Sequence, residues 1–192
     1  MLTASESQAH QAQERPAATR PDDRWAACDV MGLIALLSGS FMVVLDFFIV
    51  MVALPSIQAD LHASSASIQM VVTGYGLANA VALIAGGKLG DIFGRQRMFQ
   101  LGLGLFLIAS LACALTPTAP LLIAARVAQG LAGALLQPQV LGIVSTLYSG
   151  ARRAKAFAWY GVAIGSAGVV AQLVGGLLIH FETAASGWRS CF

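Results

Sequence analysis

The stretch VMGLIALLSGSFMVVLDFFIVMVAL, from Val30 to Leu54, decides the fold class of this chain. It carries a single charged residue, Asp46, and is otherwise apolar or small. A helix needs about 20 predominantly apolar residues to cross the hydrocarbon core of a bilayer. Residues 30–54 are long and apolar enough to meet that requirement, so they predict a membrane-spanning helix.

The composition of the whole chain points the same way. Hydrophobic residues make up 57% of the 192 residues and charged residues only 10%, against about 25% charged residues in soluble domains. Many of the charges precede residue 30, namely Glu6, Glu14, Arg15, Arg20, Asp22, Asp23, Arg24 and Asp29. Too few remain to solvate a globular surface, which excludes a soluble enzyme, a nucleic-acid-binding domain and a disordered chain. We therefore expect a membrane protein that is not an enzyme.

Further apolar stretches follow the first, separated by short polar connections. None alternates between apolar and polar residues as a membrane β-strand does, so helices are expected throughout. The sequence thus predicts an all-α membrane protein with spans at residues 30–54, 67–89, 98–115, 121–147 and 156–181. Residues 1–29 form a polar tail without an apolar core, which argues against a cleaved signal peptide.

Lysine and arginine residues set the predicted orientation. Most lie in the tail and in the connections after the second and fourth spans, namely Arg15, Arg20, Arg24, Lys88, Arg95, Arg97, Arg152, Arg153 and Lys155. The connections after the first and third spans carry none, and Arg189 follows the fifth span. Because basic residues collect on the cytoplasmic side, we predict a multi-pass protein of the plasma (inner) membrane with a cytoplasmic N-terminus.

Two ionisable residues, Asp46 and Arg126, fall inside predicted spans. Asp46 lies roughly 12 Å below the outer end of the first span, and Arg126 roughly 9 Å below that of the fourth, at 1.5 Å per residue. Opposite charges at similar depth can pair, which lowers the cost of burying each one. Two interpretations stay open: a static salt bridge that fixes helix packing, or a carboxylate whose proton affinity depends on how near Arg126 lies.

Several uncharged polar residues also fall within the spans, among them Asn79, Gln129 and Gln172. Each could line a cavity, or could form a hydrogen bond to a neighbouring helix, and the second role is the more common one in membrane proteins. The three cysteines and three histidines show neither a disulfide framework nor metal-ligand spacing. We predict no metal site and no catalytic site.

Glycines and charges concentrate at two places. Residues 87–97 read GKLGDIFGRQR, where Gly94 permits a tight turn and Asp91 comes shortly before the third span. A short cytoplasmic turn with orienting charges would account for most of this pattern. In the fifth span, Gly161 and Gly165 have the small-xxx-small spacing that lets helices approach closely.

Taken together, these segments resemble the major facilitator superfamily. Residues 45–55, LDFFIVMVALP, are similar to Leu-Asp-x-Thr-x-Val-Asn-x-Ala-Leu-Pro of its drug:proton antiporters. Residues 87–97 are close to the signature Gly-x-Leu-x-Asp-x-x-Gly-Arg-x-Arg, and residues 126–130, RVAQG, match Arg-x-x-Gln-Gly. The chain most resembles the N-terminal part of a fourteen-span antiporter of the quaternary-ammonium multidrug efflux type.

The resemblance implies a role for each group of residues. It implies proton coupling for Arg126, with Asp46 as its partner or as the protonation site. A cytoplasmic latch that stabilises the outward-facing state would comprise Gly87, Asp91, Gly94, Arg95 and Arg97. The fifth helix would be shaped, where it meets the C-terminal half, by Gly161, Gly165, Gly175 and Gly176. The proton gradient would supply the energy without a cofactor, and the partners would be the lipid bilayer and a lipophilic or cationic small molecule.

The resemblance also predicts that the chain stops short. Halves of this superfamily have six spans each, built from repeats of three, whereas this sequence predicts five. Residues 187–192, GWRSCF, are similar to the Gly-Trp-Arg-x-x-Phe that precedes the sixth span in the family. We expect an incomplete N-terminal six-helix bundle, truncated before helix 6, that requires the missing C-terminal half and does not transport alone.

Two other functions remain open at this point. One is a membrane interaction protein that does not transport and associates with other helix bundles through its glycine-rich fifth span. The other is a facilitator-type importer, or an exporter of one metabolite. Residues 171–176 favour the latter, because they read AQLVGG, where the antiporter signature has Gly-Pro-x-x-Gly-Gly.

Overall fold

The computed structural model describes residues 27–181 and 187–192, as five long helices and one short 3₁₀ helix. The long helices are α2 (Ala27–Asp60), α3 (Ser65–Phe93), α4 (Arg95–Leu115), α5 (Ala119–Leu147) and α6 (Gly150–Phe181), and the 3₁₀ helix is η1 (Gly187–Cys191). All five are long and apolar enough to cross a membrane. The predicted all-α membrane protein with five spans is confirmed, whereas the predicted tail lies, up to residue 26, outside the described residues.

Each predicted span lies within one of these helices, and the helices extend beyond it at one or both ends. At the end of α2 and at the starts of α4 and α6 the additional residues include polar or charged ones, because a helix that leaves the hydrocarbon can continue in water. Ser64 caps α3 by accepting a hydrogen bond from the Ser67 main-chain nitrogen at 3.2 Å. Gly94 separates α3 from α4 at a φ of 93°, and its N–H donates to the Gly90 carbonyl at 3.0 Å. This left-handed φ is the reason for a glycine there.

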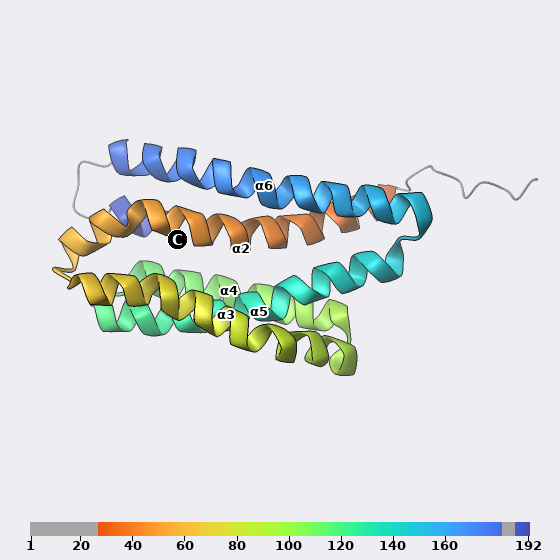
Figure 1. The fold of residues 1–192 in the computed structure, drawn as a ribbon, viewed down its shortest axis with the longest axis horizontal. Helices are drawn as coiled ribbons and strands as arrows, with labels where there is room; N and C mark the ends of the chain where they lie inside the picture. Colours follow the sequence, from red (N-terminus) through yellow and green to blue (C-terminus); the bar gives the residue numbers. More distant parts are fainter. Residues whose placement is uncertain (1–26, 182–186) are drawn as a thin grey trace, which may run out of the picture.

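The helices form two groups. α5 packs along α3 and α4, and α2 packs along α6. Figure 1 shows the α2–α6 pair on one side and the α3, α4 and α5 group on the other. We call the end of the bundle with the α2–α3 and α4–α5 turns the Asp60 end, and the opposite end, with the α3–α4 and α5–α6 turns, the Asp91 end. The two groups therefore lie side by side between these ends.

Two apolar clusters form the core. One lies toward the Asp91 end and includes Val43, Phe99 and Leu136. The other lies toward the Asp60 end and includes Ile49 and Leu122. Because Asp46 stands between Val43 and Ile49 on α2, the junction of the two clusters is the place where a charged group enters the bundle.

Glycines let α3 and α5 approach each other closely. A Cβ atom added at Gly86 of α3 would meet the main-chain oxygen of Ala134, and one added at Gly130 of α5 would meet that of Tyr75. Separating α3 from α5 would expose the apolar side chains that pack between these two helices. This contact fixes the rotation of α5, and with it the direction of the polar side chains on that helix.

Outside the core, large apolar side chains face outward. Ile84, Val81 and Ile108 are 75%, 72% and 67% exposed. On a soluble protein such a surface would cause aggregation, whereas on a membrane protein it is the surface that contacts the acyl chains.

Candidate functional site

Asp46 and Arg126 meet in the middle of the bundle. The Arg126 Nη1 donates to the Asp46 Oδ2 at 2.6 Å, which links α2 to α5. The Arg126 side chain is fully buried and that of Asp46 is 8% exposed. A buried charge is stable only when an opposite charge and hydrogen bonds compensate it. The structure therefore shows the pairing that the similar depths of the two residues made possible.

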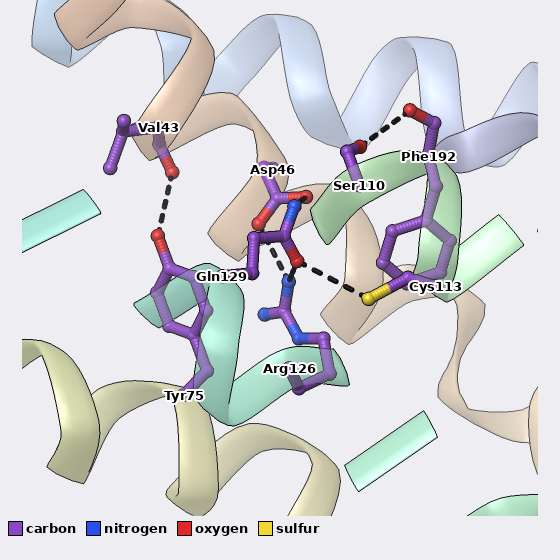
Figure 2. Close-up of polar contacts among 8 residues, drawn as sticks. All are labelled: Val43, Asp46, Tyr75, Ser110, Cys113, Arg126, Gln129 and Phe192. Atoms are coloured by element: carbon purple, nitrogen blue, oxygen red, sulfur yellow. Dashed lines mark hydrogen bonds and ion pairs between the residues drawn. The ribbon is translucent and has the colours of Figure 1, made fainter. Parts of the chain in front are cut away.

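Gln129 completes this polar group. Its side-chain nitrogen donates to the Asp46 Oδ1 at 2.9 Å, and its oxygen accepts from the Arg126 Nη1 at 2.7 Å. Gln129 follows Arg126 by three residues, so both lie on the same face of α5. As a result, each carboxylate oxygen of Asp46 has its own donor, and all three side chains interact in a closed ring (Figure 2).

Tyr75 of α3 covers the guanidinium. The Arg126 Cζ lies 4.1 Å from the centroid of the Tyr75 ring, a distance typical of a cation–π contact. The Tyr75 hydroxyl reaches the carbonyl oxygen of Val43 on α2 at 3.5 Å. Sequence reasoning missed this residue, although a tyrosine far from either end of a span is unusual, since tyrosines gather at the membrane interfaces.

Two further groups near the pair were also missed. The Cys113 thiol of α4 donates to the Gln129 Oε1 at 3.5 Å. The ring of Phe192 lies 5.8 Å from the Arg126 Cζ, so it approaches the guanidinium from another direction than Tyr75. Figure 2 shows both residues on the same side of Arg126, away from Tyr75. Neither contact could be foreseen, because it depends on how α4 and the segment after α6 are placed.

Arg126 is only partly satisfied. One nitrogen, Nη1, makes both hydrogen bonds, and within residues 27–181 and 187–192 no partner is found for Nε or Nη2. A buried donor without a partner costs free energy. The arrangement therefore holds a carboxylate and a cation in contact while leaving one edge of the cation free to take another acceptor.

The predicted latch residues gather at the Asp91 end. The Arg95 Nη2 donates to the Asp91 Oδ1 at 2.6 Å, across the Gly94 turn. Arg95 also lies over Gly142 of α5, where a Cβ atom would collide with its guanidinium. Gly87 lies next to Pro138 of α5, and Arg97 is exposed on the first turn of α4. Among these residues the structure brings Asp91 and Arg95 into contact, and the latch role of all five stays a prediction.

The other predicted residues lie apart from the pair. Asn79 sits against Gly133 of α5, whereas Gln172 is exposed on α6. Gly175 packs on Ile49 of α2. The remaining glycines of the predicted α6 set have no described atom near the Cβ position, namely Gly161, Gly165 and Gly176. Their predicted packing role therefore finds no partner helix among the described residues.

Comparison with known families identifies the fold. Residues 36–192 match the model of the Major Facilitator Superfamily, which is most of the chain. The chain belongs to the major facilitator superfamily. This finding confirms the resemblance to the superfamily that the motifs at residues 45–55, 87–97 and 126–130 indicated.

Curated proteins match the chain at substantial identity. A protein of Streptomyces coelicolor named "Probable actinorhodin transporter" is 41% identical over 169 residues, covering 88% of this chain and 28% of that relative. The "Puromycin resistance protein pur8" of Streptomyces alboniger is 39% identical over 180 residues, covering 93% of this chain and 34% of that relative. The chain thus spans about a third of the length of these relatives.

A solved major facilitator structure shows the same helix arrangement. The bacterial homologue of the human lysosomal transporter Spinster, in an inward-facing and occupied conformation, superposes with a TM-score of 0.77 at 21% identity. The match covers 88% of this chain and 41% of that one. The five helices therefore have the arrangement of part of a major facilitator fold, as the sequence predicted.

Proposed function

We propose that this chain is the N-terminal part of a proton-coupled exporter of drugs or other small organic molecules. The observation that carries the proposal is the buried ring of Asp46, Arg126 and Gln129, which joins the two helix groups by charge. The names of the relatives support the export of antibiotics, because they include a puromycin resistance protein and an actinorhodin transporter. In this proposal the chain is a transporter and not an enzyme, and it needs no cofactor.

The proton step follows from the position of the carboxylate. Asp46 has two donors, both on α5, while the residue itself is on α2. A movement of the α2–α6 pair away from α5 would remove both donors together. A carboxylate in an apolar site binds a proton more readily once its cationic partner has moved away. Alternating access of two transporter halves around a central site would supply such a movement, and the proton gradient would drive it.

The residues at the Asp91 end would form the latch. In our proposal this end is cytoplasmic and the protein spans the plasma membrane, in agreement with the excess of basic residues there. Asp91 and Arg95, held by the turn at Gly94, would contact a second half of the transporter in the outward-facing state. Arg97 and Gly87 would complete the contact. The open glycine face of α6 at Gly161 and Gly165 would provide a surface for the same half.

The substrate would be lipophilic or cationic, as expected for a fourteen-span antiporter of the quaternary-ammonium type. Asn79 and Gln172 would contribute to the cavity only together with residues of the second half. For the same reason we propose that the 192-residue chain is inactive on its own.

A chimera tests this function directly. The matched third of the puromycin resistance protein is replaced with this chain, and the tolerance of cells to puromycin is measured. We expect the chimera to restore tolerance, Asp46→Asn to reduce it to that of cells without a transporter, and the matched control Ser166→Ala, on the exposed face of α6, to leave it unchanged. Full tolerance in the Asp46→Asn chimera would refute the proton-coupling role of Asp46.

A second candidate is a membrane interaction protein that does not transport. The same open face of α6 favours it, because Gly161, Gly165 and Gly176 could contact another copy of this chain. A stable oligomer in mild detergent that Gly165→Leu dissociates, together with a chimera that confers no tolerance, would support this alternative.

A further inference from the structure

Residues 187–192, η1 and the following Phe192, form a compact structure at the Asp60 end. Trp188 is 1% exposed, and its indole nitrogen donates to the Asp60 Oδ2 of α2 at 2.9 Å. Tryptophan buried in this way needs a partner for its N–H, and Asp60 provides it. The segment is thereby joined to the last turn of α2.

Arg189 joins the same segment to α4. Its Nη1 donates to the carbonyl oxygens of Ala114 at 3.0 Å and Thr116 at 2.7 Å. Carbonyl groups at the end of a helix lack partners within the helix, and a cation there is favourable. The Arg189 Nη2 also lies 3.6 Å from the Asp60 Oδ2, and its Cζ lies 4.4 Å from the Trp188 ring. One side chain therefore connects the ends of α2 and α4 through the segment.

Phe192 extends from this anchor toward the buried pair. Its ring packs edge-on against Trp188, with centroids 6.3 Å apart, and lies 5.8 Å from the Arg126 guanidinium. Its main-chain oxygen accepts a hydrogen bond from Ser110 of α4 at 2.8 Å, as Figure 2 shows. Trp188 and Cys191 belong to the same apolar cluster as Cys113. The segment thus places apolar groups between the Asp60 end and the pair.

We infer that residues 187–192 act as a lid over the Asp60 side of the Asp46–Arg126 pair, and that Arg189 keeps this lid closed. The lid excludes water from the pair, which strengthens an ion pair and its hydrogen bonds. Its value for proton coupling rests on the proposed function: proton access to Asp46 from the Asp60 end would require the lid to open. The lid itself can be tested without transport.

Cys113 provides the measurement, because its thiol is buried beside Gln129 and packs in the cluster of the lid. The 192-residue chain is placed in lipid nanodiscs and treated with a soluble maleimide, and the labelling of Cys113 is followed by peptide mass spectrometry. We expect Arg189→Gln to accelerate this labelling by roughly tenfold, the effect on an opening equilibrium of losing a charge-assisted hydrogen bond. The matched control Arg153→Gln, an exposed arginine near the start of α6 at the Asp91 end, should leave the rate unchanged.

A second variant keeps the test decisive if Arg189→Gln does not fold. Asp60→Ala removes the acceptor of Trp188 and the carboxylate near Arg189, but leaves the bonds of Arg189 to the α4 carbonyls. It should accelerate the labelling of Cys113 with unchanged helix content by circular dichroism. A rate equal to that of the parent chain in the folded variants would overturn the lid. Failure of the puromycin chimera, by contrast, would leave these rates unaffected.

Discussion

The side chains of Asp46 and Arg126 come from different helix groups and meet at 2.6 Å between two apolar clusters. Each charge is stable in that position only because of the other. The α2–α6 pair and the α3–α4–α5 group are therefore joined, near the centre of the molecule, by a contact whose strength depends on protonation.

Removing one charge of this pair should cost more than removing both. Arg126→Met leaves the Asp46 carboxylate buried with Gln129 alone, and breaking a buried pair in this way costs about 3–5 kcal/mol. The double variant Asp46→Asn/Arg126→Met buries no charge and should recover much of that loss. Urea unfolding of the chain in detergent measures the free energy of unfolding of all four members of the cycle. Additive losses would show that the two side chains do not interact.

Tyr75 should hold Arg126 through its ring more than through its hydroxyl. Tyr75→Leu removes the cation–π contact at 4.1 Å, and we expect a loss of about 2 kcal/mol, as for a desolvated pair. Tyr75→Phe keeps the ring and loses only the long hydrogen bond to Val43, so it should stay close to the parent chain. Urea unfolding of both variants gives their free energies of unfolding. Equal losses of this free energy in Tyr75→Leu and Tyr75→Phe would rule out the ring contact.

The close approach of α3 and α5 predicts opposite effects for two glycines of α3. Gly86→Ala places a methyl group against the main chain of Ala134, so it should destabilise the bundle and displace Arg126 from Asp46. Gly76→Ala is the matched control, because nothing lies within 4 Å of its Cβ position. There alanine should stabilise the helix by about 0.5–1 kcal/mol. Thermal unfolding followed by circular dichroism compares them, and a stable Gly86→Ala variant would contradict the close contact.

At the Asp91 end, we expect a substitution in the predicted latch to reduce transport without reducing the stability of the chain. Asp91 and Arg95 are 61% and 35% exposed, and exposed ion pairs contribute about 0–1 kcal/mol. Asp91→Asn should therefore leave the melting temperature of the chain nearly unchanged but reduce puromycin tolerance in the chimera, where the latch has a partner. The matched control is Gln96→Ala, on the exposed first turn of α4. Equal tolerance in the Asp91→Asn and control chimeras would remove the latch role.

Hydropathy was sufficient to predict the helices, because a span is specified by its own residues. The spacing along α2 and α5 also placed Asp46 and Arg126 at similar depth, which made their contact a reasonable expectation. The sequence could not show how each helix is rotated about its axis. For that reason Gln129 was expected only as a possible cavity or packing residue, and Tyr75 was not expected at all. Both become part of the site through the α3–α5 contact at Gly86 and Gly130.

At the Asp60 end, too, the sequence could not predict which residues come into contact. The motif at residues 187–192 was recognised from the family, but its contacts with Asp60, Ala114 and Arg126 join residues more than 60 positions apart. No local pattern predicts such contacts. Likewise, the glycines of α6 gave one helical pattern, whereas Gly168 and Gly175 pack on α2 and Gly161 has open space around it.

The Arg126 Nη1 makes two hydrogen bonds, whereas Nη2 and Nε have no partner in the part of the chain that the structure describes. This asymmetry has a mechanical consequence. If α2 shifts along α5, Asp46 can exchange Nη1 for Nη2 without leaving the guanidinium, because a carboxylate fits two adjacent nitrogens of the fork. The shift then has an intermediate position in which the charges are still paired. Sliding by one nitrogen therefore keeps the two charges in contact, and complete separation of the charges is needed only when the helices move further.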